Sequence, residues 1–290
     1  MSKLYKKLLN HDYSPGEMGE CIAEAKRMPV TVERAPILRE IFSCLDLTSL
    51  NTSDSDATIR SFAERASQFG YSFSEISNVA ALCVYPNFAR VAREGLANCG
   101  VKLAVVAASF PTAQTYTEVK ILETSMAARM GADEIDVVIP VGTFLEGALD
   151  TVIDELKEIR EAAGETTLKV ILETGLLKDE RNIYRASIIA MESGADFIKT
   201  STGKSIVSAT PEAAWVMCRA IRDYYNETGI MIGFKPAGGI VTPDDAMVYY
   251  FIVKNMLGAK WLTPDYFRIG ASRLANNILS ELFPGTPAYF

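Results

Sequence analysis

Asp196-Phe-Ile-Lys-Thr-Ser-Thr-Gly-Lys204 is a short apolar segment that ends on a lysine and continues into a turn of small residues. Ile232-Gly-Phe-Lys-Pro-Ala-Gly-Gly239 repeats this pattern. A lysine at the end of a buried strand is costly unless its charge is used, because burial removes the ammonium group from water. If the two segments are neighbouring parallel strands, Lys199 and Lys235 lie side by side.

Similar apolar, β-branched runs recur along the chain, separated by longer amphipathic stretches. We predict eight strands at residues 44–48, 78–85, 102–107, 134–139, 168–173, 196–199, 230–235 and 267–271. Short strands that are apolar along most of their length are typical of a parallel sheet covered on both faces. Thr210-Pro211 and Thr242-Pro243 each place a capping hydroxyl before a proline at the first position of a helix.

This alternation predicts an α/β fold, a single (β/α)8 TIM barrel over residues 41–283 with an N-terminal helical extension. A doubly wound open sheet is the alternative, but it usually carries a glycine-rich loop after its first strand. Asp46-Leu-Thr-Ser-Leu-Asn51 contains no glycine. Residues 1–40 are expected to form the extension, packed on the bottom or side of the barrel, and residues 284–290 a flexible C-terminal tail.

The composition excludes several classes of function. No run reaches the roughly 18 apolar residues of a membrane helix, and residues 1–10 lack the features of a secretory signal. The net charge of −7 argues against nucleic acid as a partner. Five scattered cysteines without a C-x-x-C spacing suit reduced thiols in a cytoplasm. The single histidine, His11, excludes a catalytic triad or a histidine-ligated zinc in the body of the chain.

Strand alternation selects the side chains that point into the barrel, and active sites lie at the C-terminal strand ends. With Ile198 and Phe234 facing the helices, Lys199 and Lys235 face the interior. An ordinary lysine is neutral only about 0.04% of the time at pH 7. A neighbouring cation favours the neutral amine, which is the form that attacks a carbonyl. The residues leave open which lysine reacts, and the alternative is that both are strand-end lysines that extend to water.

Two carboxylates are expected to share this interior. Asp136 alternates with Ile135 and Val137, so it points inward and could relay protons to a lysine. A structural salt bridge is the alternative. Asp46 is a similar candidate on the first strand, and its alternative is an ordinary capping aspartate.

Three glycine-bearing turns follow the last three predicted strands: Ser201-Thr-Gly-Lys204, Pro236-Ala-Gly-Gly239 and Gly270-Ala-Ser-Arg273. Barrels often bind phosphate in the loops after their last strands, because glycines let backbone N–H groups approach the anion. Lys204 adds a positive charge. We therefore expect a phosphate site here, although each turn alone would also fit an ordinary loop.

These motifs, together with Leu45-Asp-Leu-Thr48, Cys83-Val-Tyr-Pro86 and Asp133-Glu-Ile-Asp-Val-Val138, resemble those of the DeoC-type class I 2-deoxyribose-5-phosphate aldolases. The resemblance runs from about Leu45 to Leu282. It implies that Lys199 forms a Schiff base, that Lys235 keeps its amine neutral and that Asp136 handles the protons. The substrate-binding residues that it implies are Asp46, Thr48, Cys83, Gly203, Lys204, Gly238, Gly239 and Ser272.

The implied reaction is the reversible cleavage of 2-deoxy-D-ribose 5-phosphate to D-glyceraldehyde 3-phosphate and acetaldehyde, in deoxyribose phosphate catabolism. It needs no metal and no other cofactor, and a homodimer is expected. The chain departs from the family at Arg273, where a second serine is expected, and at Tyr289, which is penultimate rather than last. Tyr289 is nevertheless expected to contact the site. The alternatives are another Schiff-base aldolase of transaldolase or keto-acid type, and a catalytically silent phosphosugar-binding barrel.

Overall fold

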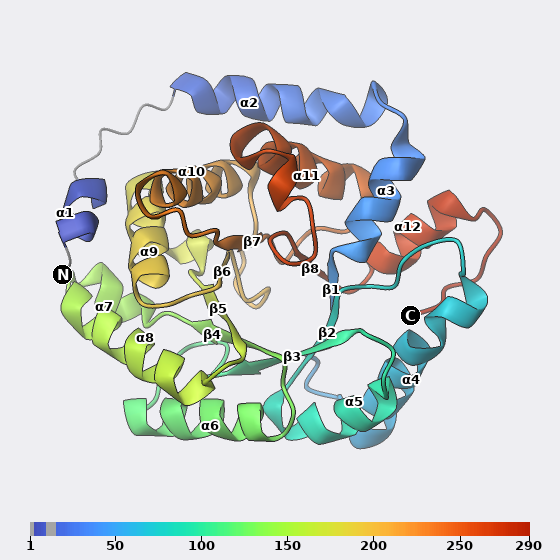
Figure 1. The fold of residues 1–290 in the computed structure, drawn as a ribbon, viewed down its shortest axis with the longest axis horizontal. Helices are drawn as coiled ribbons and strands as arrows, with labels where there is room; N and C mark the ends of the chain where they lie inside the picture. Colours follow the sequence, from blue (N-terminus) through green and yellow to red (C-terminus); the bar gives the residue numbers. More distant parts are fainter. Residues whose placement is uncertain (1–2, 10–15) are drawn as a thin grey trace.

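Eight parallel strands form a barrel in the order β7-β6-β5-β4-β3-β2-β1-β8 (Figure 1). The computed structural model describes residues 3–9 and 16–290, so His11 lies outside the described residues. The barrel closes between β7 and β8 through the parallel bridges Phe234–Phe267 and Ala237–Gly270. The predicted (β/α)8 TIM barrel is confirmed.

The strands are β1 (Leu45–Thr48), β2 (Ala81–Val84), β3 (Lys102–Ala107), β4 (Glu134–Val138), β5 (Thr167–Ile171), β6 (Phe197–Lys199), β7 (Gly233–Lys235) and β8 (Ile269–Ala271). Each overlaps one of the predicted strands. The register pairs Lys199 with Lys235 across β6 and β7. It also pairs Asp136 with Lys169 across β4 and β5. Lys169 in turn pairs with Phe197, two residues before Lys199.

A ring of helices surrounds the strands. They are α4 (Asp56–Ser72), α5 (Ala89–Leu96), α6 (Thr117–Arg129), α7 (Val141–Leu145), α8 (Leu149–Ala163), α9 (Glu180–Glu192), α10 (Pro211–Thr228), α11 (Pro243–Leu257) and α12 (Leu274–Leu282). Short 3-10 turns are η2 (Pro86–Phe88), η3 (Thr174–Leu176) and η4 (Ala259–Trp261). The side chains of Thr210 and Thr242 each accept a hydrogen bond from the third residue of their helix, so both predicted caps are confirmed.

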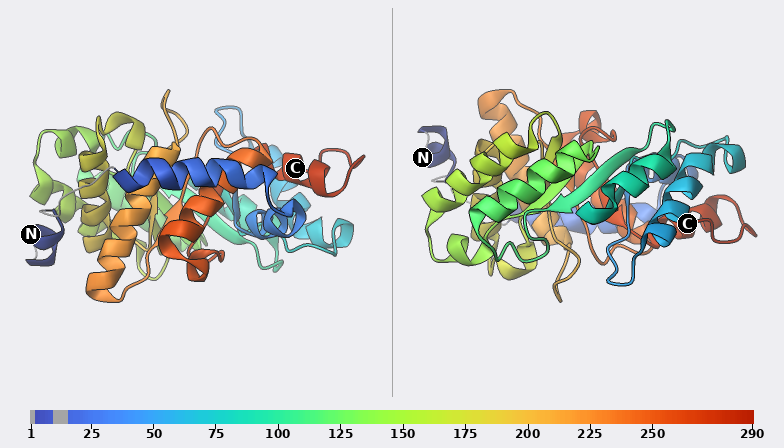
Figure 2. Two further views of the ribbon diagram at one scale, coloured as in Figure 1. Left: turned by 90° about the horizontal axis from the view of Figure 1, so that it is seen from above. Right: turned by 90° about the horizontal axis from the view of Figure 1, so that it is seen from below.

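The N-terminal extension lies on the side of the barrel. It consists of α1 (Lys3–Leu9), α2 (Gly16–Arg27), η1 (Met28–Val30) and α3 (Arg34–Ser43). Helix α2 crosses the outer surfaces of α10 and α11, as Figure 2 shows. It buries Ile22 and Ala25 there, so this side of the helical ring has a second apolar layer over it.

The core has two chemically different layers. Ile198 and Phe234 are fully buried in the large apolar cluster between the strands and the helices. Lys199 and Lys235 are also buried, but they belong to a charged group inside the barrel. Among the helices that the structure describes, none is long and apolar enough to cross a membrane.

Candidate active site

Seven charged side chains lie buried inside the barrel, each no more than 4% exposed. They are Asp46, Glu134, Asp136, Lys169, Lys199, Lys235 and Arg268, and we call them the charged layer. They come from six strands or from residues next to a strand. Buried charges are tolerated only when they are paired and hydrogen-bonded, and the contacts within this group meet that condition.

The two predicted lysines meet at one oxygen atom. The Nζ atom of Lys199 lies 2.7 Å from Oδ2 of Asp136. The Nζ atom of Lys235 lies at the same distance, 2.7 Å, from that oxygen and also donates to Oδ2 of Asp46. Asp136 therefore holds the two amines close together, and Asp46 ties Lys235 to β1, two strands away across the β7–β8 closure.

Three members of the charged layer were not predicted as site residues. The Nζ atom of Lys169 lies 2.6 Å from Oε2 of Glu134 and 2.9 Å from Oδ1 of Asp136. Arg268 donates to both carboxylate oxygens of Glu134, at 3.0 and 2.7 Å. Strand alternation could have found Lys169 and Arg268, because each is flanked by two apolar residues, as Asp136 is.

The surrounding charges fix the protonation of two groups. Burial alone would raise the pKa of Asp136, but Lys169, Lys199 and Lys235 outweigh it and hold that pKa well below its usual value. Burial opposes the charge of Lys235, yet Asp136 and Asp46 outweigh it and raise the pKa of Lys235. Asp136 is therefore a carboxylate at neutral pH, and Lys235 is a cation.

A cavity of about 300 Å³ opens above the charged layer at the C-terminal ends of β1, β6, β7 and β8. The predicted site residues that line it are Thr48, Lys199, Gly203, Lys204, Gly238, Gly239 and Ser272. Lys199 thus connects the charged layer to the cavity, whereas Lys235 lies beneath it and is completely buried. This difference in access separates two lysines that the sequence pattern treats alike.

The far end of the cavity is built from turns that require glycine. Gly203 and Gly238 have φ angles of 78° and 84°, in the left-handed region that favours glycine. A Cβ atom on Gly238 would also lie 2.6 Å from Oγ of Ser208. The Nζ atom of Lys204 lies 2.6 Å from the carbonyl oxygen of Leu50, so this lysine spans from the β6 loop to the β1 loop. Arg273 also lines the cavity, immediately before α12 begins.

Cys83 and Asp46 lie below the cavity rather than in its lining. Cys83 is fully buried in a small apolar cluster with Ala104 and Val106. Burial, together with the negative charge of Asp136, raises the pKa of its thiol to about 12. Cys83 is therefore a neutral packing residue in this structure, and Asp46 is a partner of Lys235.

The structure does not bring Tyr289 to the cavity. Its hydroxyl group donates to the carbonyl oxygen of Arg65 at 2.8 Å, and its ring packs edge-on against Phe69 and Phe73 of the α4 region. Its backbone N–H donates to the side chain of Asn276 on α12. In this arrangement the tail fastens α12 to α4 on the outside of the barrel.

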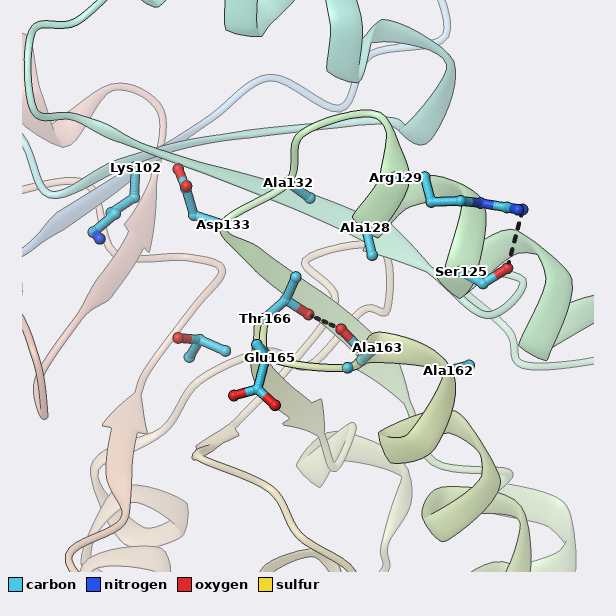
Figure 3. A pocket seen from close by; sticks show the side chains of 12 residues that line it. Lys102, Ser125, Ala128, Arg129, Ala132, Asp133, Ala162, Ala163, Glu165 and Thr166 are labelled. Carbon is cyan, nitrogen blue, oxygen red and sulfur yellow. Dashed lines mark hydrogen bonds between the residues drawn. The ribbon is translucent and has the colours of Figure 1, made fainter.

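A larger hollow of about 710 Å³ lies at the opposite end of the barrel, where β3, β4 and β5 begin (Figure 3). Lys102, Asp133 and Thr166 are among its lining residues. No member of the charged layer and no predicted site residue lines it. The chemistry therefore belongs to the smaller cavity above the lysines.

Within residues 3–9 and 16–290, no group of three or more His, Cys, Asp or Glu side chains is arranged to hold a metal ion.

The sequence profile described as "DeoC/LacD family aldolase" matches residues 43–262. The chain is similar to the deoxyribose-phosphate aldolase of Bos taurus, with 41% identity covering 89% of this chain and 84% of the relative. It is also similar to that of Homo sapiens, with 41% identity, 90% coverage of this chain and 85% of the relative.

A solved structure of the tetrameric deoxyribose phosphate aldolase from Aeropyrum pernix has the same fold, with a TM-score of 0.68 at 24% identity. It covers 90% of this chain and 97% of that one. The profile match over most of the chain and the identity to the mammalian relatives lead to one conclusion, which agrees with the paired lysines. The chain belongs to the DeoC/LacD family of aldolases.

Proposed function

We propose that this chain cleaves 2-deoxy-D-ribose 5-phosphate reversibly to D-glyceraldehyde 3-phosphate and acetaldehyde, with Lys199 as the Schiff-base nucleophile. One observation carries the proposal: Lys199 lines the cavity, and its amine shares Oδ2 of Asp136 with the buried, charged Lys235. The identity to the Bos taurus and Homo sapiens deoxyribose-phosphate aldolases supports this substrate.

The charge balance of the layer supports Lys199 as the nucleophile. The layer holds four basic side chains and three carboxylates. Lys169 pairs with Glu134 and Asp136, and Lys235 pairs with Asp46 and Asp136. Among the described residues, Lys199 forms an ion pair with Asp136 alone. Without Lys199, Asp136 would still be paired with Lys169 and Lys235. The three carboxylates therefore keep cationic partners without Lys199, which leaves its amine available to react.

The mechanism follows from this arrangement. The Lys199 amine adds to the C1 carbonyl of the open-chain sugar, and Asp136 accepts the proton that the nitrogen loses. Asp136 returns this proton to the carbinolamine hydroxyl, which leaves as water. Asp136, a carboxylate again, accepts the proton of the 3-hydroxyl as the electrons of the C2–C3 bond move to the iminium nitrogen, releasing glyceraldehyde 3-phosphate. Asp136 then returns this proton to C2 of the enamine, and water hydrolyses the resulting iminium to acetaldehyde and free Lys199.

The phosphate group would lie at the far end of the cavity. Gly203, Gly238 and Gly239 bring backbone close to the cavity, and Ser272 adds a hydroxyl. Arg273 stands at its edge, beside the N-terminus of α12, where an anion is favoured. Arg273 could replace the second serine of the family with a charged, two-pronged donor.

Reductive trapping tests the nucleophile. With acetaldehyde and borohydride, we expect a stable N-ethyl group on Lys199, located by mass spectrometry of peptides. An adduct on Lys235 would reverse the assigned roles. Trapping by pyruvate but not by acetaldehyde would favour a keto-acid aldolase. No adduct with either carbonyl would favour a barrel that only binds phosphosugars.

We further propose a homodimer formed through α6. Val119, Leu122, Met126 and Met130 are 47–55% exposed and follow one another at intervals of three or four residues, so they form one apolar face. Helix α2 covers α10 and α11, whereas no described element crosses the outside of α6 (Figure 1). The tetramer of the Aeropyrum pernix protein supports self-association in this family.

The charges on α6 suit a second copy in antiparallel orientation. With the two-fold axis near the middle of the helix, Leu122 faces Met126 of the other copy, and Glu118 faces Arg129 on the same flank. We expect E118R and R129E each to raise the dimer dissociation constant about tenfold, and E118R/R129E together to restore pairing. Analytical ultracentrifugation measures this, with E20R on the exposed surface of α2 as the control. A monomeric wild type, or single variants that pair normally, would contradict the proposal.

We place the protein in the cytoplasm. All five cysteines are free thiols, and three of them are buried. Thiols are kept reduced in that compartment.

A further inference from the structure

Glu173 is a buried carboxylate outside the charged layer, at the end of β5. It is 3% exposed. Its backbone is left-handed, with φ of 54° and ψ of 56°. A residue with a Cβ atom adopts this conformation only where its surroundings hold it, and such residues gather at functional sites.

The carboxylate of Glu173 receives two hydrogen bonds from one residue of the cavity wall. The hydroxyl of Thr202 donates to Oε2 at 2.5 Å, and the backbone N–H of Thr202 donates to Oε1 at 3.3 Å. No lysine or arginine among the described residues forms an ion pair with Glu173. The two oxygens of this buried side chain are therefore satisfied by the two donors of Thr202 and not by a cation.

These bonds continue into the glycine turn of the cavity. The hydroxyl oxygen of Thr202 accepts a hydrogen bond from the backbone N–H of Lys204 at 3.0 Å. Since that oxygen accepts from Lys204, its own hydrogen is free to point at Glu173. Gly203 lies between these two residues, with φ of 78°, and all three line the cavity.

We propose that Glu173 is a positioning residue that sets the anion-binding turn at Gly203. Thr202 presents two donors to it, and an ionised carboxylate supplies an acceptor for each. A glutamine would turn its NH2 group toward one of these donors and release the turn. The consequence rests on the proposed function: Glu173 acts on the phosphate end of the substrate and not on the carbonyl that meets Lys199.

Steady-state kinetics of E173Q test this placement. For 2-deoxyribose 5-phosphate we expect KM to rise about tenfold, while kcat stays within about twofold of wild type. A tenfold rise in KM is the effect expected from the loss of one charge-assisted hydrogen bond. Cleavage of unphosphorylated 2-deoxyribose should be unchanged. T202V should show the same split, and E173Q/T202V should be no worse than T202V, because the two residues act through one link. The matched control is E165Q, on the surface.

Phosphate binding supplies a measurement independent of turnover. Inorganic phosphate should raise the Tm of the wild type, and E173Q should need about tenfold more phosphate for the same shift. A wild type that does not cleave the phosphorylated sugar but shows this phosphate difference would contradict the proposed substrate and support the role of Glu173. Equal phosphate shifts in the two proteins, or equal losses with both sugars, would overturn that role.

Discussion

Replacement of Lys199 by methionine is expected to lower turnover of 2-deoxyribose 5-phosphate by about 10⁴-fold or more, because no covalent intermediate can form. The folded state should persist. Asp136 keeps its contacts with Lys169 and Lys235, at 2.9 and 2.7 Å, so the change leaves no buried carboxylate without a cation. The measurements are a coupled assay for glyceraldehyde 3-phosphate, borohydride trapping, and a urea unfolding curve.

Two results would contradict this assignment. One is a borohydride adduct that persists in K199M, and the other is turnover within about a hundredfold of the wild type. The control is K157M on the exposed face of α8, which changes the same side chain away from the site and should keep full activity. A loss of activity in K157M would point to a general effect of the substitution.

Replacement of Lys235 by methionine is expected to lower turnover about 10³-fold at pH 7 and to move the activity optimum to higher pH. Without this cation, Asp136 stabilises the charged form of Lys199 with less opposition, so fewer enzyme molecules hold the reactive amine. Asp46 and Asp136 also lose a buried partner, which should reduce the free energy of unfolding by about 3–5 kcal/mol. Rates of acetaldehyde trapping from pH 6 to 10 measure the first effect.

The pH dependence of stability has a definite sign. The folded-state pKa of Lys235 is raised, so its contribution to stability is fully present below the unfolded pKa of about 10.4. That contribution is lost as the pH rises through the folded pKa. The stability difference between wild type and K235M should therefore stay constant from pH 6 to 9 and shrink only above about pH 10.

The control for this second variant keeps the charge. K235R should retain more stability than K235M, because a cation still faces the two carboxylates. A K235M enzyme whose trapping rate follows the wild-type pH profile would show that Lys235 does not govern the state of Lys199.

The barrel and the paired lysines were predictable because both depend on short-range patterns. Alternation within Phe197–Lys199 places Ile198 outward and Lys199 inward without any knowledge of the rest of the molecule. The same rule applied to Leu168–Val170 would have identified Lys169. The strand pattern alone could not distinguish the two lysines, because Lys199 and Lys235 are in register, and their access depends on the loops that surround the cavity. Only the resemblance to the family implied that Lys199 is the one that reacts.

Other features depend on contacts between distant segments. The hydrogen bond from Thr202 to Glu173 depends on the left-handed backbone of Glu173. The sequence around a glutamate does not predict this conformation. The position of Tyr289 depends on how the tail packs against α4 and on its hydrogen bond to Asn276. The tail of the family suggests a role at the site, but only the folded structure shows which surface these aromatic residues cover.

Through Arg268, the charged layer also contributes to the closure of the barrel. The barrel closes between β7 and β8 through isolated bridges rather than through a continuous ladder, and Arg268 lies at that closure. Its guanidinium group reaches Glu134 on β4, on the far wall of the barrel. The ion pair between Arg268 and Glu134 thus connects the β7–β8 closure to the opposite wall of the barrel. These two residues belong to the same charged layer that surrounds Lys199. A change in the charges below Lys199 would therefore also weaken the closure of the barrel, whereas a change in the loops above it would not.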